Sequence, residues 1–351
     1  MKRIVVCSAE APFIPVGGAE MMTQGLVRAL GEQGFSVDYV GLPFTDDPRP
    51  NVLRSAMAWR MLNLDHVPGH GQKIDAVICL QYPSYVLRHP CKIVWLMHQH
   101  RSAYDLQGTP YSDFSDSPAD QAYADMIRRL DTQTLGEARA LYAISRTVAD
   151  RLQRYNGLRA TPVYQPPPRA ERYHCESYGD YVFTVSRQDP QKRNDLLIRA
   201  MPYTRSGIRA VIGGTGPVLE ANKALAVELG VADRVEFLGF VAEERLITLY
   251  ANALAVYYAP FDEDYGFVTL EGFLSRKPVV TARDSGGTLE FVKDGKTGCV
   301  FDPEDVAGLA RALDGLMADK GQAERMGEAG YRRVDGITWD AVVHALTEMI
   351  P

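Results

Sequence analysis

The chain has 351 residues, a net charge of −6 and a hydrophobic fraction of 46%, which suits about two globular domains and excludes wholesale disorder. The acidic balance, concentrated in the second half of the chain, argues against a nucleic-acid-binding protein, which needs a concentrated basic face. The longest uninterrupted apolar runs, such as residues 93–97, are far shorter than a membrane span.

Five cysteines are scattered along the chain without a Cys-x-x-Cys pair or a zinc-binding spacing. An odd, scattered set favours free thiols in a reducing compartment over a disulfide framework. The N-terminal Met1-Lys2-Arg3 leads straight into a strand-like apolar run, so we expect no signal peptide. The sequence therefore predicts a cytoplasmic protein.

Strand-like and helical patterns alternate through the first half of the chain. Strands are predicted at residues 2–8, 37–41, 74–80, 92–97 and 141–145, and helices at 19–33 and 146–155. A glycine- and proline-rich loop at 12–18 separates the first strand from the first helix. Residues 104–118 are polar, aromatic and proline-containing, which predicts a long functional loop.

Three consecutive prolines at 166–168 cannot lie inside a helix or a central strand, and they predict a stiff connector between domains. The alternation then restarts. Strands are predicted at 181–186, 210–212, 235–238, 255–258 and 278–281, and helices at 195–201, 217–229, 243–250, 267–274, 306–317 and 339–349.

This alternation on both sides of a linker predicts an α/β protein with two Rossmann-like, doubly wound parallel sheets. The expected domains are residues 1–165 and 166–336, with 337–351 as a final helix. Ligands of such sheets bind at the carboxyl ends of the strands, so we expect the site in a central cleft between the domains.

Three glycine turns follow predicted strands: Gly17-Gly18, Gly213-Gly214-Thr215-Gly216 and Gly286-Gly287. Glycine lets an anion approach the backbone closely, and helix N-termini offer free N–H groups to phosphates. A tight strand-to-helix turn explains each of them equally well.

Two cations, Arg187 and Lys192, follow the first predicted strand of the second domain. They could clamp a diphosphate, with Arg187 bidentate and Lys192 as a point charge. A solvated basic turn is the alternative.

The most specific segment is the run from Asp262 to Glu271. Glu263 lies in a predicted loop, Gly266 opens a predicted helix, and Glu271 lies within that helix. A carboxylate suits vicinal hydroxyls, and the helix N-terminus offers donors to phosphate or sugar oxygens. The pair Asp262 and Asp264 could hold a divalent cation, but we expect none because Arg187 and Lys192 can meet the phosphate charge.

His98 and His100 flank Gln99 directly after the predicted strand at 92–97. We expect His98 to face the cleft, where it can donate, accept or orient. His-x-His offers too few ligands for a metal site, and a capped strand end explains His100.

The ordered set of these motifs resembles the GT4 family of retaining glycosyltransferases, which has the GT-B fold. The set consists of the glycine pair, Arg187-x4-Lys192, the second glycine turn, Glu263-x7-Glu271 and Gly286-Gly287. The resemblance covers essentially the full length and is most specific over residues 181–301. It departs at Gln99, where family members often have an aspartate after the histidine.

The resemblance implies a role for each matching residue. Arg187 and Lys192 would hold the diphosphate, Glu271 the ribose hydroxyls, and Glu263 the donor-sugar hydroxyls. The remaining donor-binding residues would contribute mainly backbone groups: Gly17, Gly18, Gly214, Val241 (with 239–241 against the base), Gly266, Phe267 and Val268. His98 matches a family histidine near the reacting carbon, so the catalytic set would be His98, Glu263, Arg187 and Lys192.

The implied activity is a metal-independent, retaining transfer of a hexose from a UDP- or GDP-sugar, forming an alpha linkage, with no other cofactor. The acceptor would be a sugar or lipid-linked glycan of bacterial surface polysaccharide or lipopolysaccharide synthesis. The predicted final helix would return to the first domain.

Residues 51–65 could form an amphipathic helix that touches the inner face of a membrane, or a helix packed on the core. Two other functions stay open. One is a nucleotide-sugar epimerase or hydrolase on the same scaffold, and the other is a non-catalytic nucleotide-sugar-binding homologue. The Glu263-x7-Glu271 spacing favours the transferase.

Overall fold

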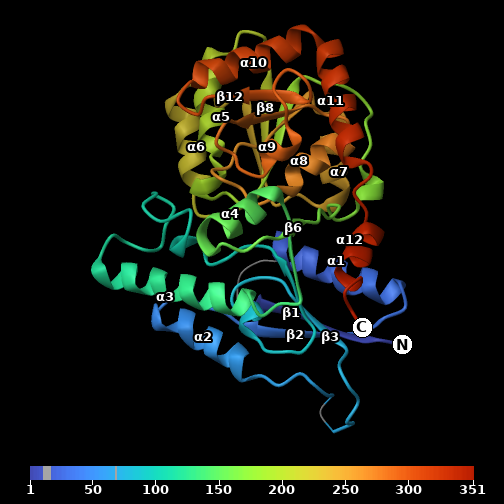
Figure 1. The fold of residues 1–351 in the computed structure, drawn as a ribbon. Helices are drawn as coiled ribbons and strands as arrows, with labels where there is room; N and C mark the ends of the chain where they lie inside the picture. The colour runs from blue at the N-terminus through green and yellow to red at the C-terminus, as the bar shows by residue number, and fades with distance from the viewer. Residues whose placement is uncertain (11–16, 68) are drawn as a thin grey trace. The chain divides into compact units, whose positions relative to one another are not determined.

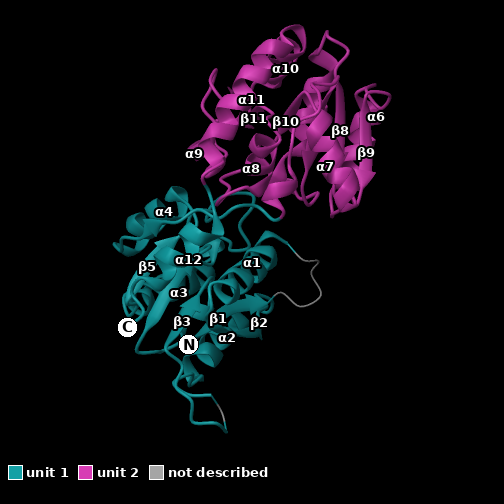
Figure 2. Cartoon of the chain, turned by 90° about the vertical axis from the view of Figure 1, so that its right-hand side faces the viewer, with its two compact units in different colours: residues 1–168, 337–351 teal, residues 169–336 magenta. Residues whose placement is uncertain are grey.

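The computed structural model describes residues 1–10, 17–67 and 69–351, and it divides the chain into two compact units (Figures 1 and 2). Unit 1 comprises Met1–Pro168 and Ile337–Pro351, and unit 2 comprises Arg169–Gly336. The chain thus leaves unit 1 at the end of the proline run rather than before it. The first part of the predicted loop at 12–18 lies outside the described residues.

Unit 1 is built on a parallel sheet with the strand order β2-β1-β3-β4-β5-β6. The strands are β1 (Arg3–Glu10), β2 (Ser36–Pro43), β3 (Ala76–Cys79), β4 (Lys92–Leu96), β5 (Ala140–Ala143) and β6 (Thr161–Pro162). The central strands β3 and β4 are buried along their whole length, as expected of a parallel sheet covered on both faces. The helices are α1 (Gly18–Glu32), α2 (Pro50–Met61), α3 (Pro118–Leu135), α4 (Arg146–Asn156) and α12 (Trp339–Thr347).

Unit 2 repeats this plan with the parallel order β12-β11-β10-β7-β8-β9. Its strands are β7 (Tyr181–Val185), β8 (Arg209–Gly213), β9 (Val235–Gly239), β10 (Ala255–Tyr257), β11 (Val279–Ala282) and β12 (Gly298–Phe301). Its helices are α5 (Asn194–Ala200), α6 (Leu219–Glu228), α7 (Glu243–Asn252), α8 (Phe267–Leu274), α9 (Thr288–Phe291), α10 (Val306–Ala318) and α11 (Lys320–Val334). The prediction of two doubly wound parallel sheets is confirmed.

Helix α11 is absent from the sequence prediction, because its buried face is made largely of small residues. Gly327 and Gly330 are among its buried residues. A Cβ placed on Gly330 would enter the ring of Phe273 on α8, so glycine is what lets the two helices pack closely. A period of large apolar side chains, the usual signal of a helix, is therefore missing. Helix α3 and the strands β6 and β12 were also not predicted.

The final helix, α12, belongs to unit 1 and packs against α1. The indole of Trp339 meets that of Trp95 edge to face, with ring centroids 6.3 Å apart. A Cβ on Gly25 of α1 would overlap the Trp339 ring. Gln33 Nε2 donates to Asp340 Oδ1 over 2.9 Å. The first and last segments of the described chain thus share one core.

Candidate functional site

The predicted donor-site residues of unit 2 follow successive strands of its sheet. Arg187 and Lys192 follow β7, Gly214 follows β8, Val241 follows β9, and Glu263 follows β10. Carboxyl ends of neighbouring parallel strands meet at one edge of a sheet. Residues that are far apart in sequence are therefore gathered at this edge of unit 2.

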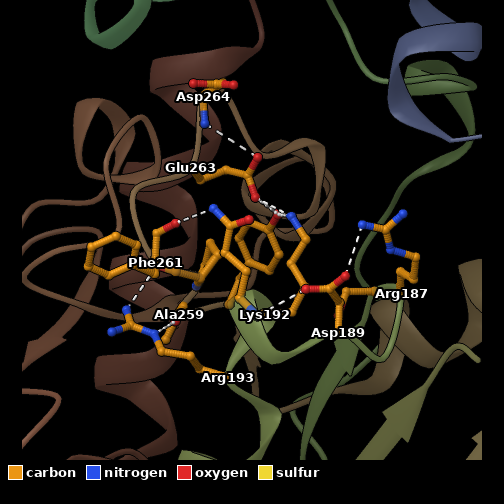
Figure 3. Close-up of polar contacts among 12 residues, drawn as sticks. Arg187, Asp189, Lys192, Arg193, Ala259, Phe261, Glu263 and Asp264 are labelled. Carbon is orange, nitrogen blue, oxygen red and sulfur yellow. Dashed lines mark hydrogen bonds and ion pairs between the residues drawn. The ribbon is translucent and has the colours of Figure 1, made fainter. Parts of the chain in front are cut away.

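The centre of this edge is an ion pair between Lys192 Nζ and Glu263 Oε2 (Figure 3). Tyr258 Oη donates to the same carboxylate oxygen over 2.7 Å and accepts from Lys192 Nζ over 3.3 Å. The Lys192 and Glu263 side chains are 22% and 18% exposed, so both are partly covered but reachable from solvent.

The charge state of Glu263 follows from these contacts. Burial alone raises the pKa of Glu263, but the Lys192 ammonium and the Tyr258 hydroxyl outweigh burial and hold the pKa below its ordinary value. Glu263 is therefore a carboxylate at neutral pH, with oxygens that can accept hydrogen bonds from hydroxyl groups.

Arg187 lies on the same loop as Lys192 and is 60% exposed. Its Nη2 pairs with Asp189 Oδ2 over 3.0 Å (Figure 3). Asp189 also caps the short 3-10 turn Pro190–Lys192 by accepting from the backbone N–H of Gln191. An exposed guanidinium that pairs through one Nη atom with a half-buried carboxylate keeps other donors available to an anion.

The glycine turn after β8 is required by the backbone beside it. Gly214 has φ +103° and Gly216 has φ +155°. A Cβ on Gly214 would overlap the carbonyl of Ser186, and one on Gly216 would overlap that of Gln188. The two loops that follow β7 and β8 therefore lie directly against each other.

Helix α8 begins where the sequence predicted. Gly266, with φ +83°, is its N-cap, so the backbone N–H groups of Phe267 and Val268 belong to the unpaired first turn of the helix. The Gly286-Gly287 turn packs under the same loop. The N–H of Gly287 donates to the carbonyl of Glu263 over 2.6 Å, and a Cβ on Gly286 would overlap the Glu263 backbone. That glycine pair supports Glu263.

Glu271 is anchored from α7. Tyr250, which is fully buried, donates from Oη to Glu271 Oε2 over 2.6 Å. Burial raises the pKa of Glu271, and the hydroxyls of Tyr250 and Tyr173 offset part of this rise. Sequence reasoning missed both tyrosines, because no local pattern announces a partner on another element.

A second arginine holds the loops of this edge together. Arg193 donates to the carbonyl of Ala259 over 2.8 Å (Figure 3) and to that of Pro260 over 2.9 Å. Both its Nη atoms contact the carboxylate of Asp284. This buried guanidinium joins the loop after β10 to the loop after β11, and it too was missed from the sequence.

The loop after β9 presents an apolar side chain to solvent. Phe240 is 84% exposed, whereas the neighbouring Val241 packs a methyl group towards Gly213. This largely exposed aromatic ring offers a flat apolar surface at the edge that carries the predicted donor-site residues.

In unit 1, Gly17 is the N-cap of α1, and its N–H donates to Glu20 Oε2 of the same helix over 2.9 Å. Gly18 is the first helical residue. His98 follows β4, and its Nδ1 lies 2.9 Å from the carbonyl oxygen of Gln99. Gln99 is buried and donates to Asn156 Oδ1 over 3.1 Å, which gives it a structural role in unit 1.

Two features that the described residues lack bear on the site. Across residues 1–10, 17–67 and 69–351, no three His, Cys, Asp or Glu side chains come together as a metal site. Within the same part of the chain, every helix is too short or too polar to cross a lipid bilayer.

Residues 176–333 match the model of the family described as glycosyl transferases group 1. The chain is 37% identical over 206 residues to the GDP-mannose-dependent alpha-(1-6)-phosphatidylinositol monomannoside mannosyltransferase of Mycolicibacterium smegmatis, over 54% of this chain and 53% of that protein. It is 33% identical over 177 residues to the D-inositol 3-phosphate glycosyltransferase of Nocardia farcinica, over 48% and 39% of the two proteins. The matched part of the chain thus spans about half the length of the first of these relatives.

Solved structures match over nearly the whole chain. HepE of Anabaena, in complex with UDP and glucose, superposes with a TM-score of 0.72 at 17% identity over 98% of both chains. WaaG, a glycosyltransferase involved in lipopolysaccharide biosynthesis, gives 0.71 at 14% identity over 97% of this chain and 99% of that one. These similarities establish the fold as GT-B, as predicted. The match to the glycosyl transferases group 1 model lies within unit 2, which comprises Arg169–Gly336.

Proposed function

We propose that the chain is a retaining glycosyltransferase of the GT4 type that transfers a sugar from a UDP- or GDP-sugar to an acceptor and forms an alpha linkage without a metal. The observation that carries this proposal is the Lys192–Glu263 pair beside the N-terminus of α8. A cation, a carboxylate and free backbone donors at one sheet edge suit a diphosphate joined to a sugar.

The roles follow from the chemistry of each group. Lys192 and Arg187 neutralise the diphosphate, and the N–H groups at 266–268 and the turn at Gly214 add backbone contacts. Glu263 accepts from hydroxyls of the donor sugar, and Glu271, held by Tyr250, accepts from the ribose hydroxyls. Phe240 and Val241 lie against the base. We assign His98 to orientation of the sugar, and Gly17 and Gly18 to the phosphates.

The reaction breaks the bond between the anomeric carbon and the diphosphate oxygen. The acceptor hydroxyl forms its new bond on the same face, and its proton passes to the departing phosphate oxygen. Positive charge at Lys192 and Arg187 stabilises the negative charge that develops on the diphosphate. The sugar becomes oxocarbenium-like, as in glycoside hydrolysis. No strong protein nucleophile is needed.

The proposed acceptor is a sugar or a lipid-linked glycan of bacterial surface polysaccharide synthesis, reached by peripheral contact with the inner face of the membrane. Three observations support this. WaaG acts in lipopolysaccharide biosynthesis, and the mycobacterial relative acts on a phosphatidylinositol mannoside. Unit 1 also carries a groove of about 480 Å³ along α2, lined by Pro50, Leu53, Arg54, Met57, Ala58, Met61 and Tyr123.

A thermal-shift panel of UDP, GDP, ADP, UDP-glucose, UDP-N-acetylglucosamine and GDP-mannose, with and without EDTA, tests the donor. A ligand that binds only the native state must raise its melting temperature. We expect a shift with uridine or guanosine diphosphates that EDTA leaves unchanged. A shift abolished by EDTA would contradict the metal-free mechanism. An unchanged melting temperature with every nucleotide would favour a non-catalytic protein. In a separate activity assay, turnover of the donor without an acceptor would favour an epimerase or hydrolase.

A further inference from the structure

A lysine and a cysteine of unit 2 are in direct contact on the segments that lead into β11 and β7, outside the proposed donor site. Lys277 Nζ lies 3.0 Å from Cys175 Sγ. Lys277 precedes β11 and has no exposed surface, whereas Cys175, on the segment that leads to β7, is partly exposed. The sulfur can therefore be reached by a small solute, while the amine is shielded behind it.

The amine of Lys277 lacks the usual carboxylate partner. It donates to the carbonyl of Ser177 and lies 4.1 Å from the centroid of the Tyr178 ring. Among the described residues, no carboxylate lies within ion-pair distance of Lys277 Nζ. Burial lowers the pKa of Lys277, which favours release of the proton that blocks the nitrogen lone pair.

The backbone holds both partners in place. On the cysteine side, the N–H groups of Glu176 and Ser177 donate to the carbonyl of Ala251 over 2.9 and 3.2 Å. On the lysine side, the Lys277 N–H donates to the carbonyl of Gly272 over 2.8 Å. Tyr178 Oη joins the two segments by donating to the carbonyl of Arg276 over 2.7 Å. Two reactive atoms held in contact by fixed backbone react as if at very high concentration.

We propose that Cys175 and Lys277 are a peroxide-responsive modification site that closes into a covalent cross-link between sulfur and the lysine nitrogen. In the first step, one hydrogen peroxide oxidises the thiol to a sulfenic acid, and its O–O bond breaks with release of water. In the second step, the neutral amine attacks the sulfur. The S–N bond forms, the S–O bond breaks, and the sulfenic oxygen leaves as water with one amine hydrogen.

A second peroxide gives the oxygen-bridged form of the same cross-link. In that form the sulfenic oxygen stays bound to sulfur and forms a new bond to the amine nitrogen. The nitrogen and the sulfenic oxygen each lose one hydrogen. The O–O bond of the second peroxide breaks, and its two oxygens leave with these hydrogens and its own as two waters. Both products join residues 175 and 277. One dithiol reduces the S–N bond to the thiol and the amine and becomes a disulfide. The oxygen-bridged form takes two dithiols and also releases its oxygen as water.

The remaining cysteines provide an internal comparison. Cys7, Cys79 and Cys91 are buried in unit 1, and Cys299, like Cys175, is partly exposed. No hydrogen bond from a lysine to Cys299 occurs in the described part of the chain, so an oxidised Cys299 has no bonded lysine amine to trap it. Cys299 is therefore the matched control for exposure without a neighbouring amine.

The test is intact-mass and peptide analysis of the full chain after treatment with hydrogen peroxide. We expect a species about 2 Da lighter, or about 14 Da heavier for the oxygen-bridged form, that dithiothreitol reverses. Digestion should give one peptide pair joining residues 175 and 277. Cys175→Ser and Lys277→Arg should abolish this species, and Cys299→Ser should keep it.

Oxidised protein that carries only added oxygen on Cys175, with no joined peptides, would overturn the proposal. So would a cross-link that survives in Cys175→Ser. The wild-type peptide map decides the matter even if Lys277→Arg fails to fold, because it reads the cross-link directly. The readout is a mass, so the proposal stands or falls independently of the proposed transferase activity.

Discussion

Tyr250 and Glu271, on neighbouring helices of unit 2, share a hydrogen bond of 2.6 Å in which the phenol donates to the carboxylate. The tyrosine has no exposed surface. A carboxylate that is half removed from water needs such a donor to stay ionised. The bond thus positions the residue to which we assign the ribose hydroxyls, and it offsets part of the rise in pKa that burial causes.

We expect Tyr250→Phe to weaken nucleotide binding. Without the donor, the pKa of Glu271 should rise further, because burial already raises it. The free energy of unfolding should fall by about 1–3 kcal/mol, because the buried carboxylate loses one of its two tyrosine donors and keeps only Tyr173. Urea denaturation and titration calorimetry with the active nucleotide measure the two effects. Tyr181→Phe, which removes a bond to the carbonyl of Leu249, is the matched control and should leave affinity unchanged. Unaltered affinity in Tyr250→Phe would contradict the assignment.

Lys192→Ala should reduce the affinity for nucleoside diphosphates by at least about tenfold, or about 1.4 kcal/mol. The variant removes the ammonium that faces the diphosphate and leaves Glu263 with Tyr258 as a partner. The pKa of Glu263 should rise, since Lys192 is what holds it down against burial. Lys223→Ala removes an exposed lysine that pairs with Glu220 and should bind like the wild type. Equal affinities in the two variants would exclude Lys192 from the donor site.

Stability should depend on pH through Asp131, which is fully buried on α3 and accepts from Tyr104 Oη over 2.7 Å. Burial raises the pKa of Asp131 to about 7, whereas the unfolded chain has a pKa of about 3.9. Between these values the folded state keeps a proton that the unfolded state has lost. Stability therefore falls as pH rises through this window, by at most about 4 kcal/mol.

Asp131→Asn should remove this fall in stability with rising pH, because an amide does not ionise. The amide oxygen can still accept from Tyr104. Urea denaturation at pH 5 and pH 8 should show a smaller loss of stability in the variant than in the wild type. Asp125→Asn, an exposed position on the same helix, controls for the change of charge. A pH profile identical to that of the wild type would rule out Asp131 as its source.

Two glycines of α1 should respond to alanine with opposite signs. Alanine in a helix interior is normally more stable than glycine by about 0.5–1 kcal/mol. Gly31 has open space beside it, so Gly31→Ala should stabilise the protein. A Cβ on Gly25 would overlap Trp339, so Gly25→Ala should destabilise it by displacing α12. Thermal denaturation measures both, and stabilisation by Gly25→Ala would show that α12 does not dock there.

The groove along α2 should bind membranes through its exposed methionines. Met57 and Met61 are 56% and 82% exposed. The double variant Met57→Glu with Met61→Glu should lose cosedimentation with vesicles that contain anionic phospholipid, because two charges would enter the apolar contact. Val227→Glu, on the exposed face of α6 in unit 2, is the control and should sediment as the wild type does. Equal sedimentation of all three proteins would exclude the groove as the contact.

Much of this architecture follows from local sequence patterns. Buried strands and amphipathic helices alternate visibly, so both sheets and the start of α8 at Phe267 could be predicted. The glycine turns could be located but not interpreted. Gly286 and Gly287 look like a ligand loop in sequence, yet their backbone supports that of Glu263.

The partners that tune the candidate site could not be predicted. Tyr258 and Tyr250 look like ordinary strand and helix residues, and nothing near Arg193 in the sequence indicates that it pairs with Asp284, which follows another strand. Such pairings depend on register and on the route of the chain between strands. Neither is encoded in a short window of sequence.

The docking of α12 on α1 has a consequence for synthesis of the protein. Residues 337–351 belong to unit 1, but they leave the ribosome only after the whole of unit 2. Domains generally fold as units during translation. Unit 2 can therefore complete its core before Trp339 is available to pack against Gly25 and Trp95 of unit 1. Unit 1, whose strands are translated first, is thus the unit whose core is completed last.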